Sequence, residues 1–186
     1  MLRQTFIETL ALIRSDMQFR CDYEHKELNA LRALGFLLNH AVMSQVLYRL
    51  QIFFYTHQLS WVAAFLQSLS SVIFTVNIDS RTHIAPGFLL LHASYIHIGK
   101  NVTIGKHCIL AHQNSIGPAY IFESDEAVSD QGPVIGARVF FGVGSVVFGN
   151  LTIGDDTKIA ANSAVDKSFP EKSILVGVPA RNRAML

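Results

Sequence analysis

The chain has 186 residues, of which 50% are hydrophobic and 16% are charged, and its formal net charge is +1. This length suits one ordinary domain, or a compact repeat body with a small appended domain. The near-neutral charge excludes a strong electrostatic footprint for nucleic acid or for an acidic partner. Two cysteines, Cys21 and Cys108, are too few for a disulfide framework, which favours a reducing, cytoplasmic setting.

The first 75 residues predict an N-terminal helical region. Apolar residues recur there at helical spacing, as at Leu31, Leu34 and Leu38, and proline is absent from residues 1 to 85. The apolar run at the start contains Glu8 and lacks a small-residue cleavage site, so we do not expect a signal peptide. The expected helices cover residues 3–19, 24–37, 39–56 and 60–73.

A stretch without Asp, Glu, Lys or Arg lies between Leu50 and Ile78. A membrane-spanning helix needs about 20 predominantly apolar residues. Several Gln, Ser and His residues interrupt this stretch. We therefore expect a pair of buried helices here, with peripheral membrane contact as the alternative.

After residue 76 the helical period gives way to a period of six. The positions that share this period are all Ile, Leu, Val or Phe, with one two-residue slip and one interruption: Ile78, Ile84, Leu90, Ile96; Ile98, Ile104, Leu110, Ile116; Ile135, Phe141, Val147, Ile153, Ile159 and Val165. Agreement over so many positions is far beyond chance. Such a period predicts a solenoid of stacked short strands.

The residue after each repeated apolar position is usually small, as at Gly99, Gly105, Gly136 and Gly154. In a triangular coil each short strand points one branched side chain inward and then turns a corner, where glycine supplies backbone freedom. Successive coils lie about 4.8 Å apart and hydrogen-bond like strands in a sheet. We expect a mainly β fold: a left-handed parallel β-helix of hexapeptide repeats over residues 76–186, after a helical region over residues 1–75.

Residues 118–134 interrupt the repeat and carry four acidic residues and no basic one. A loop of this length within a compact repeat is usually functional or mobile. Two interpretations remain open. The segment is either a solvated excursion or a flap over an active site.

Four segments together resemble a known family. They are LLLHASYIHIG (Leu89 to Gly99), the tail GVPARNR (Gly177 to Arg183), ALIRSD (Ala11 to Asp16) and VNID (Val76 to Asp79). With the hexapeptide repeats, they look like the serine O-acetyltransferase family, and more specifically like its short members associated with surface-polysaccharide biosynthesis. The resemblance implies an acetyl-CoA-dependent O-acetyltransferase.

The resemblance assigns the role of general base to His92, which would remove the proton of an acceptor hydroxyl as its oxygen attacks the thioester. A neutral imidazole suits this step because it titrates near the working pH. The family has an Asp where this chain has Asn77. An Asn can still fix the imidazole tautomer, but it cannot offset a developing positive charge. Asp79, two residues further on, is the second choice for this role.

The expected acceptor differs from that of the family's namesake enzymes. Where serine-specific members have an Asp before the base, this chain has Leu91, and where they have Arg-His in the loop it has Gln131 and Gly132 before Pro133. A carboxylate site without its Arg loses a bidentate partner. The resemblance therefore implies a sugar or saccharide hydroxyl as acceptor, rather than free serine.

The resemblance also implies a homotrimer with active sites between subunits and CoA bound along a coil edge, without a metal. The CoA-binding residues that it implies are Gly142, Val143, Lys158, Ala160, Ala161 and Arg181.

Three alternatives stay open. The first is a serine O-acetyltransferase proper. The second is a zinc hydro-lyase similar to the γ-type carbonic anhydrases, because His92 and His97, and again His107 and His112, have the H-x4-H spacing of their zinc ligands. The third is a non-catalytic trimeric scaffold.

Overall fold

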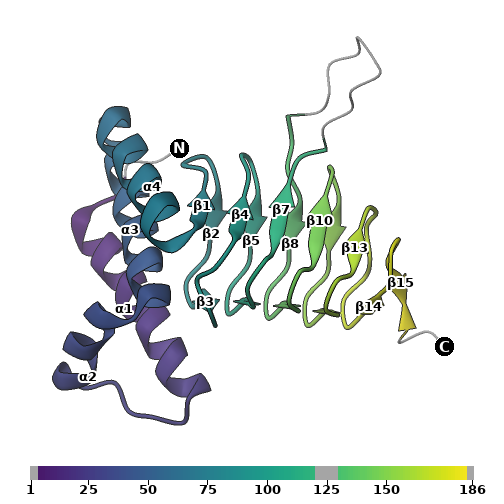
Figure 1. Cartoon of the computed structure of the whole chain (residues 1–186), viewed down its shortest axis with the longest axis horizontal. Helices are drawn as coiled ribbons and strands as arrows, with labels where there is room; N and C mark the ends of the chain where they lie inside the picture. The colour runs from purple at the N-terminus through teal and green to yellow at the C-terminus, as the bar shows by residue number, and fades with distance from the viewer. Residues whose placement is uncertain (1–3, 120–129, 184–186) are drawn as a thin grey trace.

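A computed structural model describes residues 4–119 and 130–183, and it shows a helical region packed against one end of a parallel β-solenoid (Figure 1). The helical elements are α1 (Phe6–Tyr23), α2 (Ala30–Gly35), the short 3-10 helix η1 (Phe36–Leu38), α3 (His40–Thr56) and α4 (Ser60–Phe74). Each expected helix is present, although the second is much shorter than expected. It begins only at Ala30, because the Asn29 side chain caps it by accepting a hydrogen bond from Arg32 N at 2.9 Å.

The strands form three sheets, which are the three faces of a prism. We name each sheet after its first strand. The β1 sheet contains β1 (Val76–Ile78), β4 (Ile96–Ile98), β7 (Ser115–Gly117), β10 (Val146–Phe148) and β13 (Ala164–Val165). The β2 sheet contains β2 (His83–Ile84), β5 (Thr103–Ile104), β8 (Val134–Ile135) and β11 (Thr152–Ile153). The β3 sheet contains β3 (Leu89–Leu90), β6 (Ile109–Leu110), β9 (Phe140–Phe141), β12 (Lys158–Ile159), β14 (Ile174–Val176) and β15 (Arg181–Asn182).

The pairing between strands confirms the predicted β-helix. All the pairs are parallel except the closing pair of β14 with β15, and each coil is in register with the next, as in Leu90↔Leu110 and Leu110↔Phe141. The repeated apolar positions fill the interior, and Ile98, Ile104 and Leu110 have no exposed surface. Burial of these side chains on every face is the main source of stability, at about 1.5–3 kcal/mol for each one.

Glycines follow the buried positions because neighbouring coils approach closely. Gly105, Gly136 and Gly154 have φ values outside the left-handed region. A Cβ atom on Gly105 would lie 2.5 Å from the carbonyl carbon of Gly136, and one on Gly154 would lie 2.2 Å from Glu171 N. Most left-handed turn positions carry other residues, such as Asn101, although Gly87 and Gly144 also have positive φ values. The expected reason for glycine, backbone freedom, was therefore wrong at these three sites. Glycine is required there because the next coil leaves no room for a Cβ atom.

The helical region covers the open end of the first coil. Parallel coils leave a row of carbonyl groups unpaired at the end of the stack, and an exposed sheet edge of this kind invites pairing with another chain. Side chains of α1 and α3 donate to these carbonyls: Arg20 to Leu90 O, Gln45 to Phe88 O, Tyr48 to Thr82 O, Arg49 to Ile84 O and Ala85 O, and Gln51 to Ile78 O. The helices thus satisfy the backbone of the first coil with polar side chains.

A buried ion pair holds two of the helices and the coil together. Arg49 of α3 contacts Asp16 of α1 through Nε at 2.8 Å and Nη2 at 3.1 Å, and both side chains are almost fully buried. Asp16 also accepts hydrogen bonds from the backbone N–H groups of Gly87 and Phe88. The ALIRSD segment therefore reaches the solenoid through its last residue.

The expectation of two buried helices over residues 50–78 was wrong for α4. Its buried residues are Ala63 and Ser70, whereas Trp61 and Phe65 remain 75% and 62% exposed. The helix packs on α3 and β1 through one face and leaves the other uncovered. In the described residues no single helix is long and apolar enough to span a membrane. Two helical segments, Ala30–Leu38 and His40–Thr56, meet this length and composition only when they are taken together, and they are bent by 93° where they join.

Candidate functional site

The predicted base and most of the predicted CoA-binding residues lie along one edge of the prism. This edge, which we call the histidine edge, is where the chain leaves the β3 sheet for the β1 sheet, and it contains residues 91–93, 111–113, 142–144 and 160–162. Backbone hydrogen bonds stack these corners on one another: Leu91 N on Leu110 O, Ala111 N on Phe141 O, Gly142 N on Ile159 O, and Ala160 N on Leu175 O, at 2.8 to 3.0 Å.

His92 is exposed at the first corner of the histidine edge, directly after β3. Its ring centroid lies 5.8 Å from that of His112, which occupies the corresponding corner of the next coil, and the two rings are inclined by 77°. An exposed imidazole at this place can be reached by the hydroxyl group of an acceptor molecule. The geometry therefore suits the predicted role of general base.

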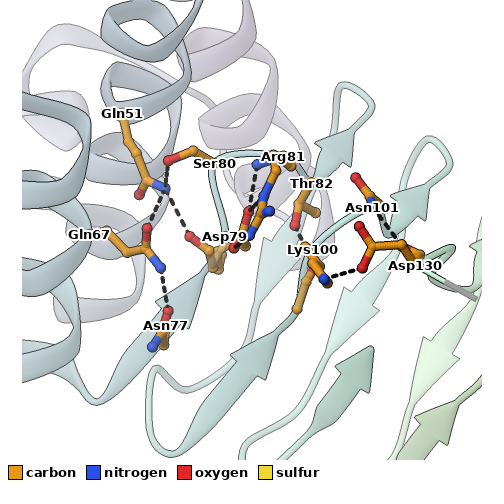
Figure 2. A network of polar contacts seen from close by, with 12 residues as sticks. Gln51, Gln67, Asn77, Asp79, Ser80, Arg81, Thr82, Lys100, Asn101 and Asp130 are labelled. Atoms are coloured by element: carbon orange, nitrogen blue, oxygen red, sulfur yellow. Dashed lines mark hydrogen bonds and ion pairs between the residues drawn. The ribbon is translucent and has the colours of Figure 1, made fainter. Parts of the chain in front are cut away.

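Asn77 and Asp79 already have partners within the chain (Figure 2). Oδ1 of Asn77 accepts a hydrogen bond from Gln67 Nε2 of α4 at 2.8 Å. The carboxylate of Asp79 takes both guanidinium contacts of Arg81, at 2.8 Å each, and this hydrogen bonding holds the Asp79 pKa below its usual range. In the described part of the chain, neither residue forms a hydrogen bond to His92.

The residues expected to choose the acceptor are divided between two edges. Leu91 lies on the histidine edge beside His92. Gln131 and Gly132 lie where the chain enters the β2 sheet, and a Cβ on Gly132 would lie 2.8 Å from Asn101 O. Between them lies the whole width of the β1 sheet. One chain therefore does not bring Leu91 and Gln131 together.

Residues 130–132 are attached to the coil below them. Lys100 forms an ion pair with the Asp130 carboxylate, and Asn101 Nδ2 donates to Asp130 O at 2.7 Å. Figure 2 shows both contacts. The remaining acidic residues of the interruption, at positions 123, 125 and 126, lie outside the described residues, so the choice between an excursion and a flap stays a prediction.

The expected CoA-binding residues occupy two neighbouring surfaces. Gly142, Val143, Ala160 and Ala161 form consecutive corners of the histidine edge. Gly142 must be small because a Cβ there would lie 2.6 Å from Ala161 N. The other two, Lys158 in β12 and Arg181 in β15, are exposed on the adjoining β3 sheet.

The four histidines of the zinc alternative do not meet. His107 stacks on Phe19 of α1, with ring centroids 4.8 Å apart, and His97 lies on the β1 sheet opposite Asn77. Only His92 and His112 are neighbours among them. In residues 4–119 and 130–183 no three His, Cys, Asp or Glu side chains are grouped as a metal site would require.

Two residues near the site were missed by sequence reasoning. Gln67, the partner of Asn77, sits in a helix and gave no signal beyond its polarity in an apolar segment. His112 was considered only as a zinc ligand. Its spacing from His92 equals that of the paired residues Leu90 and Leu110, so the repeat itself could have predicted the contact.

Comparisons with known proteins agree with this fold and with the hexapeptide repeats. Residues 134–167 match the family described as the hexapeptide repeat of succinyl-transferase. A serine acetyltransferase of Buchnera aphidicola is 31% identical over 134 residues, which are 72% of this chain and 50% of that protein. The chain spans about half or less of the length of the curated relatives it matches.

Solved structures extend the agreement to the helical region. The serine acetyltransferase of Brucella abortus superposes with a TM-score of 0.83 at 27% identity, covering 95% of this chain and 69% of that one. Its complex with coenzyme A gives the same TM-score and identity, covering 96% and 68%. Because these superpositions cover almost the whole chain, the helical region and the solenoid both belong to the shared fold. The chain belongs to the serine O-acetyltransferase-like family of hexapeptide-repeat proteins.

Proposed function

We propose that the protein is an acetyl-CoA-dependent O-acetyltransferase with His92 as its general base. One observation carries this proposal: His92 and the predicted CoA-binding corners at Gly142 and Ala160 lie on the same edge of the prism. Among the similar proteins, the serine acetyltransferase of Brucella abortus, which was solved in complex with coenzyme A, supports the proposed use of acetyl-CoA.

The reaction needs little from the protein beyond a base and correct placement. The imidazole of His92 takes the proton of the acceptor hydroxyl as the oxygen attacks the carbonyl carbon of the thioester. When the tetrahedral intermediate collapses, the C–S bond breaks and the imidazolium returns the proton to the leaving sulfur. Such acid–base assistance accelerates a reaction about 10²–10⁴-fold, and alignment of the two substrates along one edge adds to it.

Asn77 is the better candidate for orienting His92. Both carboxylate oxygens of Asp79 are engaged by Arg81, whereas the Asn77 carbonyl oxygen has a second lone pair besides the one that Gln67 uses. An imidazole N–H donating to that oxygen would leave the opposite ring nitrogen free to act as base. Gln67 would then hold the Asn77 amide in the orientation that this requires.

Serine is the acceptor that the relatives favour. Their names specify serine acetyltransferases, which supports the alternative among our sequence predictions better than the main one, a saccharide hydroxyl. Our argument against serine was the missing Arg near Gln131. Because Gln131 lies one sheet away from His92 in its own chain, this argument has force only if a neighbouring subunit supplies that segment.

A homotrimer with sites between subunits is part of the proposal. The separation of Leu91 from Gln131 supports it, because a neighbouring copy could place its own residues 130–132 against the histidine edge. A cytoplasmic location stays a prediction, consistent with two cysteines that are free and buried.

Release of free CoA from acetyl-CoA tests the proposal. The purified protein would be supplied with serine, other hydroxy amino acids, nucleotide sugars and oligosaccharides, and the acetylated product would be identified by mass spectrometry. We expect O-acetylserine and stoichiometric CoA. Turnover confined to saccharides would restore our original acceptor prediction, and no turnover with any hydroxyl compound would contradict the acetyltransferase assignment.

A further inference from the structure

His112 is the side chain that follows His92 along the histidine edge, and the two rings contact each other. Their centroids are 5.8 Å apart at an interplanar angle of 77°, which is an edge-to-face arrangement. His92 is exposed and His112 is half-buried, so both rings reach the surface of the same edge. A molecule lying against His92 along this edge would also contact His112.

The position of His112 lies between the proposed base and the proposed CoA-binding corners. Its carbonyl oxygen accepts a hydrogen bond from Gly144 N at 3.1 Å, and Gln113 N donates to Ser94 O at 2.9 Å. His112 is therefore one coil from His92 on one side and one coil from Val143 on the other, with coils about 4.8 Å apart. A thioester whose acyl carbon reaches an acceptor at His92, and whose pantetheine follows Val143, would place its carbonyl beside His112.

The backbone at this corner is held from inside the coil. Asn114 is fully buried, and its Nδ2 donates to Gly142 O at 2.7 Å and to Ser145 Oγ at 2.9 Å. This amide fastens the coil of His112 to the coil of Gly142. Hydrogen-bond donors that are fixed before the reaction stabilise a developing charge best, because little reorganisation is needed as it forms.

We propose that His112 is a second catalytic residue, whose imidazole N–H donates a hydrogen bond to the carbonyl oxygen of the thioester. This inference rests on the proposed function. When the acceptor oxygen bonds to the acyl carbon, the electron pair of the C=O bond moves to the carbonyl oxygen of the thioester, and His92 takes the hydroxyl proton. The His112 N–H stabilises the resulting oxyanion, which re-forms the C=O bond as CoA departs with the proton from His92.

Substitutions at His112 test the proposal. His112→Leu removes the donor and keeps an apolar side chain, whereas His112→Gln keeps a side-chain N–H. The matched control is His83→Leu, which removes an exposed histidine of the β2 sheet. Steady-state kinetics would be measured for the parent and the three variants, together with calorimetric binding of CoA, which has no thioester carbonyl.

We expect His112→Leu to lower kcat about 10²–10³-fold, with CoA binding within a factor of three of the parent. His112→Gln should recover part of the loss, and His83→Leu should match the parent. An active parent with an equally active His112→Leu variant would overturn the role of His112 alone, because backbone donors would then suffice. Weaker CoA binding that accounts for the whole loss would also overturn it. A parent without acetyl transfer to any acceptor would overturn the proposed function as well.

Discussion

Removal of the Asp16 carboxylate should lower the free energy of unfolding, because this side chain connects the helical region to the solenoid. Asp16 accepts two hydrogen bonds from Arg49 and one each from the backbone N–H groups of Gly87 and Phe88. In Asp16→Ala the guanidinium stays buried without its counter-charge, and two buried N–H groups lose their acceptor. Breaking a buried ion pair on one side costs about 3–5 kcal/mol. That is a large fraction of the roughly 5–15 kcal/mol by which domains are stable.

Urea unfolding followed by far-UV circular dichroism measures this loss as a change in the free energy of unfolding. Protein concentration must be held constant, because assembly of subunits shifts apparent stability. Asp22→Ala is the control, since Asp22 is an exposed acid on the same helix and should change stability by no more than about 0.5 kcal/mol. Asp16→Asn, which keeps an acceptor oxygen, should lose less than Asp16→Ala. A loss below about 1 kcal/mol in Asp16→Ala would refute the reasoning, because the pair would then not hold the helices to the first coil.

Two further predictions concern the coils. Gly105→Ala should destabilise the fold by about 1–3 kcal/mol in the same assay, because its Cβ would lie 2.5 Å from the Gly136 backbone. The control is Gly35→Ala, which should be neutral or stabilising because a Cβ there would have nothing within 4 Å. Equal effects at both positions would contradict the close approach of coils. Arg81→Gln should raise the Asp79 pKa, seen by NMR titration of its carboxyl carbon, because Arg81 is the main cause of its depression. A carboxyl with a depressed pKa stabilises the fold above its unfolded pKa and loses that contribution as pH falls through the folded value, so the parent should lose more stability than the variant on acidification. An unchanged Asp79 pKa in Arg81→Gln would contradict this.

The sequence predicted the solenoid well because its fold depends on a local rule. Each short strand must bury one branched residue, so positions such as Ile104 and Leu110 reveal the coil without knowledge of distant contacts. The same rule placed His92 and Gly142 on one edge once the coils were stacked in register. The reason for the glycines was not accessible in this way, because it depends on the distance between coils.

Contacts between the helices and the first coil could not be predicted. The partners Asp16 and Arg49 lie far apart in the sequence, and nothing in either segment indicates that Arg49 would cover the carbonyls of Ile84 and Ala85. The partner of Asn77 was hidden for the same reason, since Gln67 reaches it only through the packing of α4 on β1. The expected pairing of Asn77 with His92 came from the family resemblance and stays a prediction, whereas the contact that this chain shows for Asn77 is with Gln67.

The most direct test of the central claim, that the histidine edge is the catalytic edge, is the rate of CoA release in His92→Ala. With acetyl-CoA and the best acceptor at saturating concentrations, we predict that kcat falls about 10²–10⁴-fold. Binding of CoA, which we propose to lie against Gly142 and Ala160 rather than against His92, should remain unchanged. A His92→Ala variant that turns over as fast as the parent would show that the chemistry takes place elsewhere on the molecule.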